Sequence, residues 1–338
     1  MSLKRFNNST PTAGAAKNVT AADIAIELTT QLDSEFYDVE YPDREWYKVV
    51  KEEQIYNDIN PGATNYAYMT RNRHGAAAFI GHGPNNDIPM VGQSLGAVTV
   101  PIAYAAVGAE VTNEDARQYA FGVNGNLAQD LGGAMREACD NLIERSVIFG
   151  VPDLGFNGWI NYPGITTVNV AASEGTPAST AWEDKTGVEI VRDVNNALNY
   201  VWQATRTLIK PTTIFLPLKQ FAQIANMPMV IGNVGGSGGT GIAVNVIDYL
   251  AQNNVMYRVT GKELEIIPCR YLDGAGAGGT DRMVVMDRSR KNQILPFPLP
   301  YQLSEPQPKT LSVVWYAENK FGSYHVRQQG SMLYVDGI

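Results

Sequence analysis

The sequence predicts a mixed α+β protein that buries much of its surface against other protein surfaces. Charged residues make up only 18% of its 338 residues and hydrophobic residues 44%, whereas a charged share of about 25% is usual. Strand and turn patterns in the segment 61–111 precede the strongest helical pattern of the chain, and alternating strands and helices follow. An ordinary globular protein with a neutral, Asn- and Gln-rich surface would share this composition.

The first 60 residues begin as a loose arm. Residues 1–20 lack apolar periodicity, so we expect them to be flexible. Between Ala21 and Phe36, apolar residues recur at every fourth position and predict a short amphipathic helix. A helix that follows a loose arm, with no core yet formed around it, is suited to docking on a neighbouring surface.

The segment 61–111 shows strand and turn patterns and no helical period. Strands are expected at Asn65–Thr70, Ala76–Ile80 and Leu95–Val107, with a polar turn at Gly81–Asn86. Because a long excursion without helices is uncommon inside a compact domain, we expect this segment to project from the body of the protein.

The segment 112–164 starts with the longest predicted helix. Thr112 is a suitable N-cap, and the acidic residues after it favour the positive end of a helix. An apolar stripe continues to about Phe149, although glycines at 122, 125, 132 and 133 weaken the helix and can kink it. The stripe comprises Leu127, Leu131, Ala134, Ala138 and Leu142.

The segment 165–295 alternates strand and helix patterns around what we expect to be one core. Thr186 and Glu189 form a capping box, which predicts the start of a helix. Further helices are expected at Leu218–Ala225 and Ile242–Ala251. The expected strands are Ile165–Ala171, Thr212–Leu216, Glu263–Tyr271 and Met283–Asp287.

The end of the chain, 296–338, opens in a proline-rich run that we expect to be extended and poorly paired. Strands are expected at Leu311–Ala317 and Ser323–Gln328, as a pair joined by a turn at Asn319–Gly322. A chain that ends in ordered strands usually returns to an earlier part of its fold.

Net charge and cysteine content exclude several classes of protein. A net charge of −8 argues against a groove that grips nucleic acid phosphates, while an acidic wall would let packaged DNA slide. Cys139 and Cys269 are too few for a disulfide framework and lack metal-ligand spacing. No stretch is apolar enough for a membrane span, and residues 1–17 have no signal-peptide core. We therefore expect a cytoplasmic product without a membrane anchor.

One motif, Gly236–Gly241, favours an enzyme. It matches the Gly-x-Gly-x-x-Gly of dinucleotide-binding turns, follows an apolar run and precedes a predicted helix. The acidic residue that this fingerprint needs has only Glu263 and Glu265 as candidates, at the beginning of a strand, and no βαβ repeat surrounds the motif. Because glycine is frequent here, a literal match arises easily by chance, and a flexible loop tip is the favoured interpretation. The histidines, His74, His82 and His325, have no Cys, Asp or Glu at metal-ligand or catalytic spacing.

The order of these elements resembles the tailed-bacteriophage major capsid proteins, whose Hong Kong phage-type fold is shared with encapsulins. That order is a loose arm, a short helix, a long β excursion, a spine helix, an α/β region with a glycine-rich tip, and terminal strands. The resemblance covers nearly the whole chain from about Ala21, and local motifs support it. These motifs are Phe149-Gly150, Gly155-Phe156-Asn157, Pro163-Gly164-Ile165, Trp182 before the helix at Thr186–Thr205, Pro211–Phe221 and Tyr334–Ile338.

The resemblance implies a phage capsid fold with five parts. These are an N-arm with a short helix (1–60), an extended β E-loop (61–111), a P-domain with the spine helix (112–164), a mixed α/β A-domain (165–295) and a return to the P-domain (296–338). It also implies a non-enzymatic major capsid protein, without cofactor or metal, that assembles through hexamers and pentamers into the icosahedral shell around a phage genome. Its location would be the virion capsid, assembled in the host cytoplasm. Its other partners would be a portal, a separate scaffolding protein and, through weak non-specific contacts, the packaged DNA.

Candidate contact residues follow from the same resemblance. The E-loop of such proteins lies over a neighbouring subunit, which makes Arg71, Arg73 and His74 candidate contacts. The glycine-rich loop, with Gly236, Gly238 and Gly241, would lie near the axis of a capsomer.

The chain departs from some relatives in two respects. The loose residues before the first predicted helix leave no room for a long scaffolding segment, and Gly62–Glu110 contains no lysine for a covalent cross-link. We therefore expect a separate scaffolding protein and a shell held by non-covalent contacts. An encapsulin-like cellular compartment and a nucleotide-binding enzyme that uses Gly236–Gly241 remain as alternatives.

Overall fold

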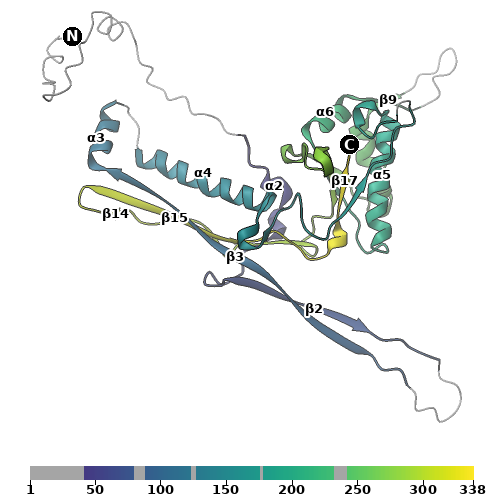
Figure 1. The fold of residues 1–338 in the computed structure, drawn as a ribbon, viewed down its shortest axis with the longest axis horizontal. Helices are drawn as coiled ribbons and strands as arrows, with labels where there is room; N and C mark the ends of the chain where they lie inside the picture. The colour runs from purple at the N-terminus through teal and green to yellow at the C-terminus, as the bar shows by residue number, and fades with distance from the viewer. Residues whose placement is uncertain (1–41, 80–87, 123–126, 176–177, 232–241) are drawn as a thin grey trace, which may run out of the picture. The chain divides into compact units, whose positions relative to one another are not determined.

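The computed structural model describes residues 42–79, 88–122, 127–175, 178–231 and 242–338 (Figure 1). The chain divides into two compact units. The first comprises residues 1–42 and 114–127, and its described part is essentially helix α3 (Asn113–Gly122). The second, called the main unit below, comprises residues 43–113 and 128–338. The helix predicted at Ala21–Phe36 lies outside the described residues.

A long antiparallel sheet forms one part of the main unit, with the strand order β13-β15-β3-β2. Strand β3 (Gly92–Thr112) is 21 residues long, and its two halves pair with different strands. The half from Ile102 to Thr112 pairs with β15 (Ser312–Gly322), and the other half pairs with β2 (Asn65–His74). Figure 1 shows β3 running from β15 to β2. Strands β13 (Leu299–Leu303) and β14 (Gln307–Pro308) pair with the other edge of β15.

A second, five-stranded sheet has the order β10-β7-β11-β17-β6. Side chains alternate between two cores along its strands: Phe215 packs into one core, while its neighbours Ile214 and Leu216 pack into the other. Because both faces of the three inner strands are buried, these three strands have largely continuous apolar runs instead of an apolar and polar alternation. The strands are β6 (Thr166–Asn169), β7 (Thr213–Leu216), β10 (Glu265–Pro268), β11 (Arg282–Met286) and β17 (Met332–Asp336).

Each core packs a different set of elements against this sheet. One contains residues of α5 (Gly187–Ala204), α6 (Leu218–Asn226), α7 (Val246–Gln252) and α8 (Val255–Thr260). The other contains residues of α2 (Trp46–Val49) and α4 (Leu127–Ile148) around the buried Trp159. The predicted capping box is confirmed, since the Thr186 hydroxyl accepts from the Glu189 N–H and the Glu189 carboxylate accepts from the Thr186 N–H.

Short strands complete the main unit. A three-stranded sheet consists of β1 (Ile55–Tyr56), β12 (Gln293–Pro296) and β16 (His325–Val326). Two pairs of strands form two-stranded sheets: β4 (Gly150–Val151) with β5 (Phe156–Asn157), and β8 (Pro228–Ile231) with β9 (Ile242–Asn245).

The predicted spine helix is described as two helices, α3 and α4, with residues 123–126 between them outside the described part. Its apolar stripe was assigned to the wrong face of α4. Met135, Cys139, Ile143 and Val147 are buried, whereas Leu142 is 42% exposed, and Ala134 and Ala138 are exposed. Both sets of positions have helical spacing, and alanine is too weakly apolar to decide between the two faces.

Four further predictions of local structure are also wrong. Asn319–Gly322 is not a turn but the end of β15, because these residues pair with β3. The proline-rich run is paired, through β12, β13 and β14. Ile242–Asn245 forms a strand before α7 instead of the start of a helix, and strand β10 ends at Pro268, after which Arg270–Leu272 forms a 3₁₀ turn.

Candidate assembly interface

Strands β2 and β3 pair as a two-stranded ribbon, Asn65–His74 with Gly92–Pro101. Only Tyr66 and Tyr68 of β2 are half-buried, and all its other residues are exposed. The predicted strand at Ala76–Ile80 is wrong for its described residues, which have no regular structure, and β2 extends instead to His74. The prediction that this segment projects from the body therefore holds for the ribbon, whereas the other half of β3 belongs to the main sheet.

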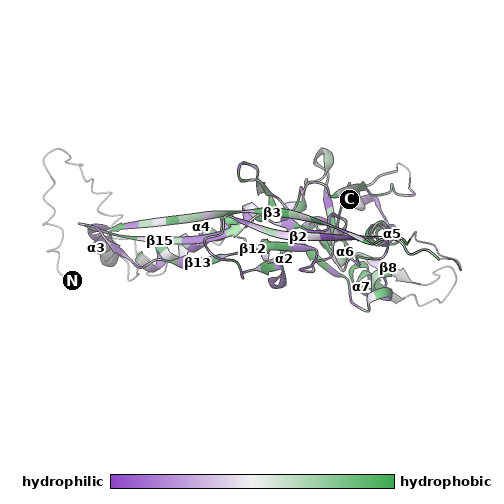
Figure 2. Ribbon diagram, turned by 90° about the horizontal axis from the view of Figure 1, so that it is seen from below, coloured by the Kyte–Doolittle hydropathy of each residue, from purple (hydrophilic) through white to green (hydrophobic). Residues whose placement is uncertain are grey.

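The ribbon carries large apolar side chains in solvent. Met69 is 82% exposed and Leu95 63% exposed, and the flanking Phe79, Met90 and Val91 are each at least 76% exposed. Figure 2 shows hydrophobic segments along β3. Soluble proteins seldom expose so many apolar side chains together unless another surface covers them. The ribbon therefore has the composition of an interface.

The three predicted contact residues of β2 divide between the two faces of the ribbon. Arg71 lies opposite Leu95, and because side chains alternate along a strand, Arg71 and Arg73 share a face with Met69. His74 lies on the other face, and all three predicted residues are exposed. One face of the ribbon thus combines two cations with apolar side chains.

The glycine-rich loop, with Gly236, Gly238 and Gly241, lies outside the described residues. The strands on either side of it, β8 and β9, pair antiparallel, with Ile231 opposite Ile242. A dinucleotide-binding turn instead joins a strand to a helix within a parallel βαβ unit. The helix α7 begins only after β9, at Val246. The surrounding structure therefore differs from the one that a nucleotide site needs.

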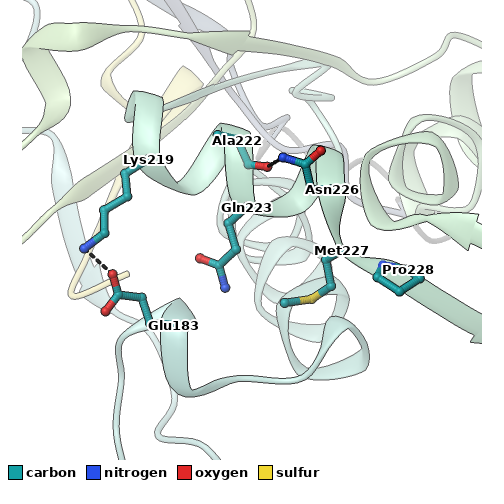
Figure 3. A pocket seen from close by; sticks show the side chains of 7 residues that line it. All are labelled: Glu183, Lys219, Ala222, Gln223, Asn226, Met227 and Pro228. Carbon is teal, nitrogen blue, oxygen red and sulfur yellow. Dashed lines mark hydrogen bonds and ion pairs between the residues drawn. The ribbon is translucent and has the colours of Figure 1, made fainter.

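A groove of about 640 Å³ lies on the surface of α6 (Figure 3). Its polar side chains have partners within the protein: Lys219 pairs with Glu183, the Gln223 Nε2 donates to the Trp182 carbonyl, and Asn226 Nδ2 donates to the Ala222 carbonyl at 2.9 Å. The Glu183 carboxylate raises the pKa of Lys219 through their hydrogen bond. These groups are occupied in holding α6 and are not directed at a ligand.

Among the residues that the structure describes, no cluster of His, Cys, Asp and Glu could hold a metal ion. Within the same residues, no helix is both long and apolar enough to span a membrane. Both cysteines are buried, and burial raises the pKa of the Cys139 thiol.

Sequence reasoning missed the side chains that hold the body end of the ribbon. His325 and Arg327, next to or within β16, contact Tyr68 and Tyr66 of β2. The contact between Tyr68 and His325 joins positions 257 residues apart. No local pattern could have indicated it, although the isolated histidine in a strand was visible.

The family model described as "Major capsid protein" matches residues 75–338. Solved phage structures share the fold. The capsid of Myoviridae phage XM1 has a TM-score of 0.73 and 13% identity, and the match covers 96% of this chain and 100% of that one. The Gordonia phage Cozz structure has a TM-score of 0.55 and 16% identity, with 97% of both chains covered.

The capsid of the native GTA particle is also similar, with a TM-score of 0.57, 12% identity, and coverage of 95% of this chain and 99% of that one. No curated protein sequence matches. At these identities the solved structures establish the fold, and the family model establishes the family.

Proposed function

Because this chain belongs to the major capsid protein family and forms a phage capsid shell, we propose that its β2–β3 ribbon is the E-loop that clamps a neighbouring subunit. The exposure of the ribbon carries the proposal. A two-stranded ribbon satisfies backbone groups only along its inner edges, and such a ribbon is marginal in water by itself. The apolar face with Met69 and Leu95 gains its cover from another copy of the chain.

Arg71 and Arg73 fit the same role. They lie on the apolar face of the ribbon, and the protein as a whole is acidic, with a net charge of −8. Cations on a projecting arm are attracted to the negatively charged surface of a second copy. The clamp thus combines apolar burial with charge complementarity.

The remaining partners are proposed from the family. A portal and a separate scaffolding protein would act with this chain during assembly in the host cytoplasm. The packaged DNA would touch the inner wall only weakly, since an acidic protein offers few cations to the phosphates. The phage structures among the similar folds favour a genome-containing shell over an encapsulin-like compartment.

The test replaces Arg73–Gln93 with a short Gly-Ser turn. This deletion removes only the end of the ribbon, where the side chains are exposed, so the soluble subunit should unfold like the full chain. Shell formation, followed by electron microscopy, should fail or give fragile particles, because a contact repeated over the lattice is lost. Normal shells would contradict the clamp. An unfolded or aggregated subunit would show that the segment belongs to the core, which also contradicts it.

A further inference from the structure

Two tyrosines are the last contact of the ribbon with the body of the main unit. Tyr66 and Tyr68 are half-buried, and they share a face with Val100 and Val98 across the ribbon. Beyond them, every residue of Met69–His74 is exposed, and the segment spans about 20 Å at about 3.3 Å per residue. A tilt of about 10° at the tyrosines would therefore move the end of β2 by about 3.5 Å. The side chains that hold the tyrosines therefore determine the direction of the ribbon.

Side chains at β16 hold both tyrosines. The Tyr68 hydroxyl lies 2.9 Å from Nε2 of His325, and Nη2 of Arg327 donates to the Tyr66 hydroxyl at 2.9 Å. The Arg327 guanidinium also lies 5.0 Å from the centre of the Tyr68 ring, within the range of a cation–π contact. Its Nη1 donates to the Arg290 carbonyl at 3.3 Å, which fixes the guanidinium to the body.

The other ring nitrogen of His325 connects it to the body. Nδ1 lies 3.0 Å from the Tyr162 hydroxyl, so the ring bridges the hydroxyls of Tyr162 and Tyr68. In a neutral imidazole one nitrogen donates and the other accepts, so both nitrogens take part in the bridge. Tyr68 is thus connected through His325 to Tyr162 in the loop after β5.

We propose that Tyr66, Tyr68, His325 and Arg327 form a latch that sets the direction in which the ribbon leaves the body. His325 holds Tyr68 and Arg327 holds Tyr66, so each tyrosine is connected to the body through a different side chain. Because both contacts lie at the base of the exposed part of the ribbon, losing them frees its direction.

The direction of the ribbon can be measured with two spin labels in the unassembled full-length subunit. Ser94→Cys labels the ribbon and Asp153→Cys labels the body, and both positions are exposed. The native cysteines are buried and leave the labelling specific. The test variant is Tyr66→Phe with Tyr68→Phe, which removes both hydroxyls and keeps the rings.

The wild-type subunit should give one narrow distance distribution. Each lost hydrogen bond should raise the share of displaced ribbon about fivefold, so the distribution of the double variant should broaden. The matched control is Tyr104→Phe. Tyr104 lies in the half of β3 that pairs with β15, and its hydroxyl donates to Glu318 of β15. The distance distribution of this control should remain narrow. A double variant as narrow as the wild type would overturn the latch.

The second arm tests His325. His325→Phe keeps an aromatic ring and removes both ring nitrogens, so its distance distribution should broaden. The control His74→Gln changes an exposed histidine of the ribbon and should stay narrow. A His325→Phe variant as narrow as the wild type contradicts the role of His325. The measured direction does not depend on assembly. If the double variant displaces the ribbon yet forms normal shells, the latch stands and the proposed clamp fails.

Discussion

The buried ion pair of Lys185 and Asp193 gives the sharpest stability prediction. The two side chains are 0% and 1% exposed, with Nζ and Oδ2 2.6 Å apart, and Nζ also donates to the Ala171 carbonyl at 2.7 Å. The pair thus ties the chain after β6 to helix α5. Lys185→Met removes the cation and leaves the Asp193 carboxylate buried without compensation.

Removing one partner of such a pair costs about 3–5 kcal/mol, which lowers the folding equilibrium constant by about 100-fold or more. With a urea dependence of about 3 kcal/mol per molar, the unfolding midpoint should fall by about 1 M or more. The measurement is urea unfolding of the unassembled subunit, followed by the fluorescence of its tryptophans.

A double variant separates charge from packing. Lys185→Met with Asp193→Leu removes both charges and leaves apolar side chains of similar size, so it should recover most of the loss. A single variant within about 1 kcal/mol of the wild type, or a double variant as unstable as the single one, would refute the reasoning.

Three further predictions concern other parts of the chain. The N–H groups of Glu174 and Thr186 hold the pKa of Glu189 at about 2, so its stabilising contribution is present above pH 4.5 and lost as the pH falls towards 2. In the variant Glu189→Gln, the denaturant midpoint of unfolding should therefore depend less on pH over that range. Gly150 has a φ of +78°, and an added Cβ would lie 2.5 Å from the Phe156 carbonyl oxygen, so Gly150→Ala should cost at least about 1 kcal/mol in denaturant unfolding. Arg71→Glu with Arg73→Glu should leave unfolding unchanged and reduce shell yield in electron micrographs; an unchanged yield would exclude a contact role for these arginines.

The sequence predicted best where local chemistry decides the structure. The Thr186–Glu189 capping box marked the start of α5, and the apolar run before Pro217 marked β7, because caps and short buried strands depend on neighbouring residues. Asn319–Gly322 has the composition of a turn, yet Asn319 is fully buried in β15. Its strand conformation comes from pairing with β3, which lies more than 200 residues away and leaves no local signal.

The candidate interface was predictable to a similar degree. The absence of helical period in 61–111 indicated a projecting segment, and the exposed Arg71, Arg73 and His74 lie on it. The half of β3 that joins the main sheet was not predicted, because an alternating strand has the same pattern whether one edge or two are paired. The contacts of His325 depend on the approach of β2 to β16, which only the tertiary fold provides.

The continuity of β3 also determines how the subunit resists mechanical force. One strand passes without interruption from the main sheet into the ribbon, and eleven residues of β15 pair with it inside the body. A pull along the ribbon therefore runs parallel to β3 and loads these hydrogen bonds in shear. Antiparallel hydrogen bonds lie perpendicular to the strands, so they share the load together instead of breaking one after another, as they would if the strand were peeled away. If the ribbon clamps a neighbour as proposed, that neighbour is connected to the rigid sheet and not to a loop, and tension from a filled shell would pass from subunit to subunit through strand β3.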